Sequence, residues 1–293
     1  MRSDLVGVLL VAAAAFQYGV VIVLGKVLTA TVSVPLLLAI RFGIASVLLT
    51  GVLTVTNRPL LATARERVRL VLLGSVGYAT SAALFFLALH YGQVATVTWL
   101  VFTYPVQVAL VSAAMGKGAP RGILGVSLAS ALAGALLVVI SSGADIRPVG
   151  IGLAVVTSMA YTSYLLGAGY AVHDTEPLTS ALWVSVAAGL GSLVFASVGG
   201  NLDIPTTFHD WWLLVAMGAG SAGAFVALFT GIARIGPVRT SIVSVLEPAS
   251  AALLGVLFLG ENMPAGTVGG AILILAAAVG AALARTGQEP PIA

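Results

Sequence analysis

The sequence contains no cysteine and little charge, since Lys, Arg, Asp and Glu together make up 8% of its 293 residues. The missing cysteine excludes disulfides, thiolate metal sites and cysteine nucleophiles, and it leaves the redox compartment open. Soluble domains carry about 25% charged residues because their surfaces face water. A water-facing exterior cannot be built from so few charges, which excludes a soluble enzyme, a nucleic-acid-binding protein and a disordered chain.

Apolar residues take the place of the missing charge: 59% of the chain is hydrophobic and the mean hydropathy is +1.11. A helix that crosses a membrane needs about 20 apolar residues. The apolar runs lack the alternation of a barrel wall, so the sequence predicts an all-α membrane protein with ten transmembrane helices. The expected ranges are 5–28, 34–54, 69–89, 94–114, 121–141, 149–172, 177–198, 211–233, 238–259 and 264–284.

The second set of five helices repeats features of the first at an offset of about 143–145 residues, as expected of an internal duplication. Because five is odd, the two copies must cross the membrane in opposite senses, and such inverted repeats are typical of alternating-access transporters. We therefore predict a repeat over 1–143, a second over 144–286 and a short cytoplasmic tail over 287–293. The matching features are Tyr91-Gly92 with Ile235-Gly236, Tyr104-Pro105 with Glu247-Pro248, and Gly116 and Pro120 with Gly260 and Pro264.

The positions of the basic residues predict the orientation in the membrane. The segment Met1 to Leu28 has no cleavage site and is expected to be the first helix rather than a signal peptide. With both termini in the cytoplasm, only Lys26 and Arg147 lie at outer ends. The basic residues then expected inside are Arg2, Arg58, Arg65, Arg67, Arg69, Lys117, Arg121, Arg234, Arg239 and Arg285.

Two charged residues lie within predicted spans, where charge is costly and usually functional. Glu247 is the one carboxylate well inside a span, and it can bind a substrate ammonium or a coupling proton. Alternatively it is a structural acid beside a kink at Pro248. Arg41 either anchors the fold, by snorkelling outward or by pairing with a helix end, or it meets a substrate carboxylate. Pro105 and Pro248, both expected in mid-helix, are candidate hinges.

Aromatic and hydroxyl residues gather at mid-depth in several predicted helices. Aromatic walls with a few polar groups suit an apolar or aromatic small molecule with a polar head. Each residue can instead serve packing between helices, as the glycines at 218, 220, 223, 266 and 270 are expected to do. The candidate substrate-binding residues are Gln17, Tyr78, Ser81, Trp99, Phe102, Thr103, Tyr161 and Ser244.

Nothing in the sequence indicates catalysis or a cofactor. Phosphate-binding loops, zinc spacings and nucleophile elbows are absent from the sequence. His90, His173 and His209 are expected in loops, each without a second ligand at metal spacing. We therefore expect neither an enzyme nor a metal site.

The helix that reads Val34-Pro35-Leu36-Leu37-Leu38-Ala39-Ile40-Arg41-Phe42, the Glu247-Pro248 pair and the Leu259-Gly260-Glu261 turn resemble the EamA type of the drug/metabolite transporter superfamily. The resemblance covers nearly the whole chain, and within the family it is strongest to YddG-type aromatic amino acid exporters. It implies export of amino acids from the bacterial cytoplasm, across the inner membrane, through a central cavity between the halves.

Two alternatives stay open beside this reading: an exporter of another metabolite or a drug-like cation, and a membrane channel or scaffold without a carrier cycle. The expected partners are a small-molecule substrate and the lipid bilayer, with no nucleic acid. A monomer is the simplest expectation, because a pseudo-symmetric bundle already encloses its own pathway.

Overall fold

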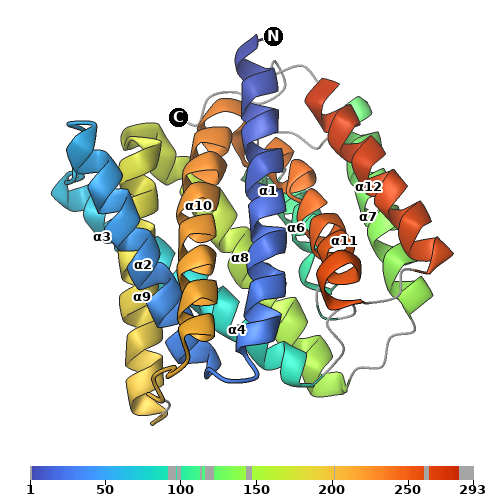
Figure 1. The fold of residues 1–293 in the computed structure, drawn as a ribbon. Coiled ribbons are helices and arrows are strands. Elements are labelled where there is room, and N and C mark those ends of the chain that lie inside the picture. The colour runs from blue at the N-terminus through green and yellow to red at the C-terminus, as the bar shows by residue number, and fades with distance from the viewer. Residues whose placement is uncertain are drawn as a thin grey trace.

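The computed structural model describes residues 2–91, 97, 100–112, 114–115, 122–142, 147–200, 202–260 and 264–283. Every regular element among them is helical (Figure 1). The elements are α1 (Arg2–Leu28), α2 (Val34–Val55), α3 (Ala64–Leu72), the π-helix η1 (Leu73–Ala79), α4 (Thr80–His90), α6 (Tyr104–Ser112), α7 (Ile123–Ser142), α8 (Pro148–Asp174), α9 (Pro177–Val198), α10 (Phe208–Val243), α11 (Leu246–Leu259) and α12 (Ala265–Leu283).

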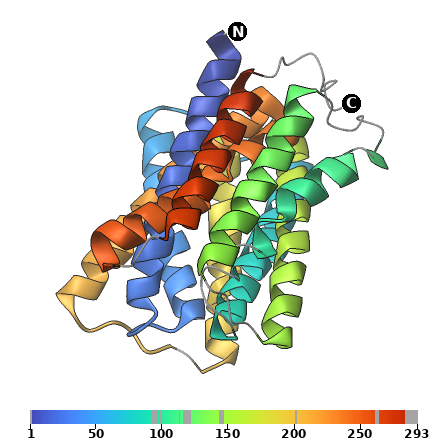
Figure 2. The ribbon, with the colours of Figure 1, turned by 90° about the vertical axis from the view of Figure 1, so that its right-hand side faces the viewer.

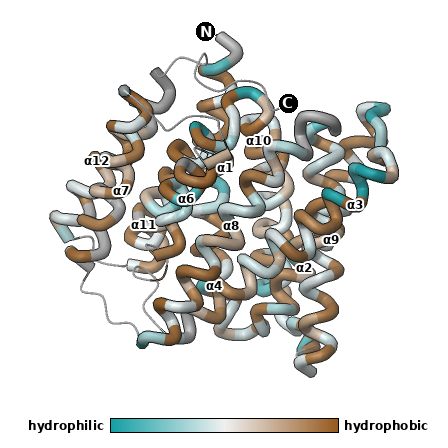
Figure 3. The backbone as a smooth tube through the Cα atoms, turned by 180° about the vertical axis from the view of Figure 1, so that it is seen from behind, coloured by the Kyte–Doolittle hydropathy of each residue, from teal (hydrophilic) through white to brown (hydrophobic). Residues whose placement is uncertain are grey.

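The surface of the bundle is apolar, as a lipid-facing surface must be. Six helices of the described chain are long and apolar enough to cross a membrane. Large side chains such as Val126, Phe195 and Leu257 point outward and are exposed. Hydrophobic residues run along most of the backbone, and α3 carries one of the hydrophilic stretches (Figure 3). The predicted all-α membrane protein with about ten helices is confirmed.

The helices pack in pairs that repeat between the two copies. One such pair is α7 and α12, green and red in Figure 2, which lie side by side. α1 packs against α10 and α11, and α8 packs in the same way against α4 and α6, while α2 contacts α9 and α7 contacts α12. The Ser130 hydroxyl of α7 donates to the Leu273 carbonyl of α12 at 3.1 Å, across a sequence separation of 143. Pro105 and Pro248 have the same separation. A residue that touches its own counterpart lies close to the axis that relates the copies.

The third helix begins earlier than predicted and changes its winding. It starts at Ala64 instead of residue 69, because Thr63 and Glu66 form a capping box that satisfies two backbone N–H groups. Arg65 and Arg67 therefore belong to its first turns rather than to a loop. α3, η1 and α4 follow one another without a break, and the π-helical stretch lies in the middle of this span.

The fourth helix of each copy is interrupted, which corrects the expectation of continuous helices over 94–114 and 238–259. A turn at Phe102 and Thr103 precedes α6, and a turn at Ser244 and Val245 separates α10 from α11. Pro105 is the second residue of α6 and Pro248 the third of α11. The prolines thus open the second half of each broken helix instead of kinking its middle, because the first turn of a helix tolerates the missing N–H.

Two further boundaries differ from the prediction. α10 begins at Phe208 and includes a non-helical residue, Gly236, that joins the eighth and ninth helices. The three histidines lie in helices rather than in loops: His90 ends α4, His173 is near the end of α8, and His209 is in the first turn of α10. The helices extend beyond their apolar stretches because helical turns continue into the polar interface of the membrane.

Glycines that the sequence predicted to serve helix packing lie at close contacts between helices of this chain. A Cβ atom at Gly218 would lie 2.6 Å from the Ile44 side chain, and one at Gly266 would lie 2.5 Å from Ser141. These contacts join α10 to α2 and α12 to α7. The small residues therefore serve packing within the chain at these positions.

Candidate functional site

A central cavity lies between the two copies and encloses about 680 Å³ of empty space, part of it continuous with the outside. Helices of both repeats contribute side chains to it, and most of these are aromatic or aliphatic. They are Tyr18, Val21, Ile22, Arg41, Tyr78, Ser81, Ala82, Phe85, Phe86, Val101, Phe102, Tyr104, Thr157, Tyr161 and Glu247.

Helical periodicity brings these side chains to the cavity. Ser81, Ala82 and Phe85 follow at intervals of one and three residues on α4, and Tyr18, Val21 and Ile22 at three and one on α1. Residues three and four apart share one face of a helix. α1 and α4 therefore each present one stripe of side chains to the cavity.

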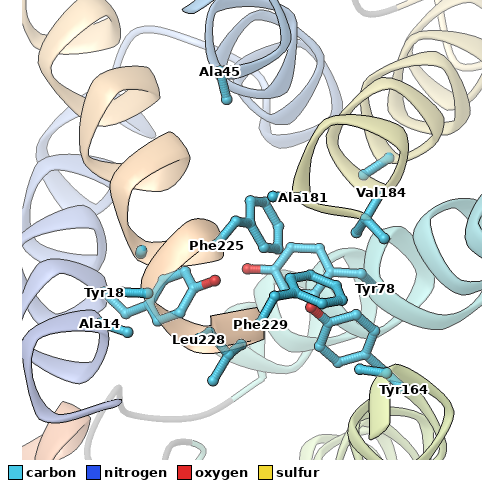
Figure 4. Close-up of a cluster of buried hydrophobic side chains, with 14 of the residues drawn as sticks. Ala14, Tyr18, Ala45, Tyr78, Tyr164, Ala181, Val184, Phe225, Leu228 and Phe229 are labelled. Atoms are coloured by element: carbon cyan, nitrogen blue, oxygen red, sulfur yellow. The ribbon is translucent and has the colours of Figure 1, made fainter. Parts of the chain in front are cut away.

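Tyr78 lines the cavity and is the centre of a cluster of aromatic rings that extends into the bundle behind the cavity wall. Its ring centroid lies 5.0 Å from those of Tyr164 and Phe225 and 5.5 Å from that of Phe42. Tyr161 extends the cluster, because its ring lies 4.7 Å from that of Tyr104. The hydroxyl groups of Tyr18 and Tyr78 point toward the same central space (Figure 4). Such edge and tilted contacts hold large aromatic rings in fixed positions.

Arg41 is buried inside the bundle, with 4% of its surface exposed. Its Nε donates to the Ser221 hydroxyl of α10 at 2.6 Å, and its Nη2 donates to the Tyr78 hydroxyl at 3.2 Å. The guanidinium carbon also lies 4.6 Å from the centre of the Phe42 ring. The alternative that Arg41 snorkels outward is therefore wrong, and the side chain lines the cavity instead.

Glu247 brings the opposite charge to the same cavity. It is the second residue of α11 and is partly exposed. A carboxylate is favoured at this place, because the first turn of a helix has unpaired N–H groups and a positive dipole end. Glu247 and Arg41 interact electrostatically, but within the described part of the chain they form no ion pair with each other. Both charges are therefore left facing the cavity.

The lining residues place the cavity on the side of the bundle away from the chain ends. We call the face where α1 begins at Arg2 and α12 ends at Leu283 the terminal face, and the opposite one the distal face. The lining residues of α1, Tyr18 to Ile22, lie in its distal half. Toward the terminal face α1 and α10 pack closely, since a Cβ at Gly7 would lie 2.6 Å from Ile235 and one at Gly231 would meet the Val11 side chain.

The structure brings six of the predicted site residues together and places others outside the cavity wall. The six that line the cavity are Arg41, Tyr78, Ser81, Phe102, Tyr161 and Glu247. Gln17 packs against Gly223 of α10, and Ser244 is buried in the turn before α11. Trp99 falls outside the described residues. A role in binding stays a prediction for all of them.

Thr103 belongs to a polar network between α6 and α8 rather than to the cavity lining. Its hydroxyl lies 3.1 Å from that of Ser158, to which the Gln107 amide also donates at 2.9 Å. Thr162 donates to the Gln107 carbonyl oxygen at 3.3 Å. These bonds satisfy polar groups that would be costly next to lipid, and they tie the half-helix α6 to α8.

Several residues that line the cavity were not among the predicted site residues. Tyr104 was noted for its place before Pro105 but not as a binding residue, and Tyr18, Phe85 and Thr157 were not among the predicted site residues. The signal was available for Phe85, which lies one helical turn after Ser81 and so on the same face. No such spacing identifies Tyr104, because the break before α6 resets the helical periodicity.

Two five-helix copies around one central cavity define a multi-pass membrane transporter built by internal duplication. The chain belongs to the EamA-like transporter family, which matches residues 5–140 and again residues 148–283. The corresponding positions are 143 residues apart, since 148 − 5 = 143. This is a family of transporters and not of enzymes.

No curated protein matches the chain. A solved crystal structure is similar in fold, with a TM-score of 0.80 and 20% sequence identity. The similarity covers 94% of this chain and 98% of the other. At this identity the likeness concerns the fold alone.

Proposed function

We propose that this transporter exports amino acids, either aromatic or more broadly neutral ones, from the bacterial cytoplasm across the inner membrane by alternating access. The observation that carries the proposal is the pair of opposite charges in one cavity, Arg41 from the first repeat and Glu247 from the second. A free amino acid has a carboxylate and an ammonium group, which complement these two side chains. Guanidinium groups bind carboxylates through two parallel hydrogen bonds.

The walls of the cavity favour an aromatic or apolar side chain on the substrate. Phe85, Phe86, Phe102 and Tyr161 present rings to the space, and aromatic rings stack or meet edge to face. The cavity thus supports a small zwitterion with a bulky apolar part.

The balance of charge argues against the other cargoes. A drug-like cation would pair with Glu247 but would leave Arg41 without an anion, and an anion would do the reverse. A charge that is desolvated without a partner costs several kcal/mol. A zwitterion, by contrast, offers an opposite charge to each group at the same time.

The orientation of the basic residues supports an outward-facing state for this conformation. If the terminal face is cytoplasmic, the lining residues of α1 lie in its outer half, and the close packing of Gly7 of α1 against α10 lies in its inner half. Arg239 does not support this orientation, because it is buried in α10 with 3% exposure and is not a surface residue. The other expected inner cations still outnumber Lys26 and Arg147. Alternating access requires a second state in which the terminal side opens and the distal side closes.

The proposal is tested by transport of radiolabelled phenylalanine into proteoliposomes that contain the purified protein. We expect saturable transport that excess unlabelled neutral amino acids inhibit and that the same amino acids on the opposite side accelerate. If cations or other metabolites inhibit transport and amino acids do not, the substrate is one of those compounds and not an amino acid. Flux without saturation or acceleration from the opposite side would instead favour a channel.

A further inference from the structure

Arg41 is held from two sides by hydroxyl groups, and these two contacts carry an inference about substrate recognition. The Ser221 hydroxyl accepts from Nε and donates its own hydrogen to the Met217 carbonyl at 2.7 Å, so its lone pairs face Arg41. The Tyr78 hydroxyl accepts from Nη2. We infer that Ser221 and Tyr78 are positioning residues that fix the Arg41 guanidinium as the receptor for the substrate carboxylate. This inference rests on the proposed function.

The donors of the guanidinium show how this arrangement works. Arginine has five N–H groups in a planar fork and no acceptor. The contacts to Ser221 and Tyr78 use two of them on the protein side, and the others are left for the cavity that Arg41 lines. A side chain with five donors loses much rotational freedom when two are fixed, so the remaining fork meets a carboxylate at a lower entropic cost.

The two positioning residues occupy corresponding places in the two copies. They are 143 residues apart, since 221 − 78 = 143, which equals the offset between the two family matches. Tyr78 belongs to the third helix of the first copy and Ser221 to the third helix of the second. Arg41 therefore bonds to equivalent positions of both copies. Its position depends on how the third helix of one copy packs relative to the third helix of the other.

The π-helix η1 contributes to the direction of Tyr78. Tyr78 is the sixth of its seven residues, and a π-helical turn holds one residue more between bonded groups than an α-helical turn. The winding therefore changes which residues face the cavity beyond this point. Gly74 and Gly77 allow the segment to approach its neighbours, since their Cβ positions would lie 2.5 Å from the Val184 carbonyl and 3.4 Å from Tyr164. Such π-helical segments recur at functional sites.

The experiment compares a substrate that has a carboxylate with one that lacks it. Radiolabelled L-phenylalanine transport is measured in proteoliposomes, with L-phenylalaninamide as a competitor that keeps the ammonium and the ring. In Ser221→Ala and in Tyr78→Phe we expect the half-saturation concentration of phenylalanine to rise about tenfold, as for a lost charge-assisted hydrogen bond. The maximal rate and the inhibition constant of the amide should change less than twofold.

The matched control is Ser127→Ala on α7. Ser127 is also buried, and its hydroxyl donates to the carbonyl four residues earlier at 2.8 Å, as Ser221 does, but it does not line the cavity. We expect this variant to transport phenylalanine like the unmodified protein. Ser221→Thr, which keeps the hydroxyl, should restore most of the affinity for phenylalanine, provided that it purifies as a folded protein.

The outcomes separate the inference from the proposed function. Equal weakening of phenylalanine and its amide, or no weakening of either, in folded Ser221→Ala or Tyr78→Phe would overturn the positioning role alone. Failure of the unmodified protein to transport phenylalanine or any other amino acid saturably would overturn the proposed function and the inference with it. If Ser221→Ala does not fold, Tyr78→Phe decides, because its ring and packing are kept.

Discussion

The interrupted fourth helices of the two copies have the same architecture but different chemistry. Each breaks at a two-residue turn, and each second half begins with a proline in its first turn. The residue before the proline is Tyr104 in the first copy and Glu247 in the second. The second helices show the reverse difference, because Arg41 corresponds to Val184, which is fully buried in α9. Each copy thus supplies one charge, from a different helix.

This difference explains how a duplicated scaffold forms an unsymmetrical site. If both copies kept Glu at the break, two carboxylates would face one cavity and repel each other, and one of them would take up a proton. A pair of opposite charges avoids this repulsion and gives the cavity two chemically distinct ends. The packed helix pairs correspond between the two copies, while the proposed zwitterionic substrate would bind in one orientation only.

The largest effect is expected when Arg41 of the first copy is replaced by valine, the residue that the second copy has at the corresponding position, Val184. Arg41→Val should lower phenylalanine transport at subsaturating concentrations about a hundredfold, because two or more charge-assisted bonds to the carboxylate are lost. Uptake into proteoliposomes measures this, with monodispersity in detergent as the test of folding. Arg58→Ala is the control: Arg58 pairs with Glu176 near the terminal face, and this exposed pair contributes little. Normal transport by folded Arg41→Val would show that the charge is structural.

Replacing Glu247, either by glutamine or by the tyrosine that the first copy has at this position, should have a smaller effect than replacing Arg41. We expect Glu247→Gln and Glu247→Tyr to raise the half-saturation concentration of phenylalanine about tenfold, because one ion pair with the ammonium is lost. In the unmodified protein the affinity should fall as the pH is lowered, since protonation removes the negative charge of Glu247. The Gln variant should show low affinity at every pH. Measurements of uptake from pH 5 to pH 8 compare the two, and a Gln variant with unchanged transport and pH dependence would remove the functional role of Glu247.

The sequence predicted the membrane class, the number of helices and the duplication, because these depend on the length and polarity of apolar runs. It also singled out Arg41 and Glu247, because charge within such a run is costly and usually functional. The structure places both in the cavity lining, and their role in binding stays a prediction. The start of the third helix at Ala64 was missed although the Thr63–Glu66 capping box is readable. That helix begins outside the apolar run, where hydropathy gives no signal.

Other parts of the site could not be read from the chain. The contact between Arg41 and Ser221 joins residues 180 apart, and only the packing of α2 against α10 decides it. Breaks at Thr103 and Ser244 are not marked by glycine or charge, so the prolines alone suggested kinks in mid-helix. The π-helix at residues 73–79 likewise has no sequence signature that distinguishes it from an α-helix.

A stability effect is expected at the joint between the eighth and ninth helices. Gly236 has φ 73° and ψ 166°, a region that is essentially restricted to glycine. Gly236→Ala should lower the free energy of unfolding by about 1–3 kcal/mol, measured by SDS titration in mixed micelles. Gly152→Ala is the control, because Gly152 lies in α8 with open space around its Cβ position. This variant should gain about 0.5–1 kcal/mol of unfolding free energy.

A Gly92→Ala variant sharpens the comparison between the two copies. A loss of stability equal to that of Gly236→Ala would indicate the same backbone conformation at the corresponding position of the first copy.

The smallest effects are expected at the two prolines, and they distinguish an opening turn from a kink. The first N–H groups of a helix have no partner within it, so the missing N–H of Pro105 or Pro248 removes no bond in α6 or α11. Pro105→Ala and Pro248→Ala should each change the free energy of unfolding by less than about 1 kcal/mol. A proline inside a continuous helix costs about 3 kcal/mol, so a gain of that size on substitution would mean that the proline itself imposes the break. An equally small effect in both variants would show that the surrounding packing holds both breaks open, independently of the chemistry that separates Tyr104 from Glu247.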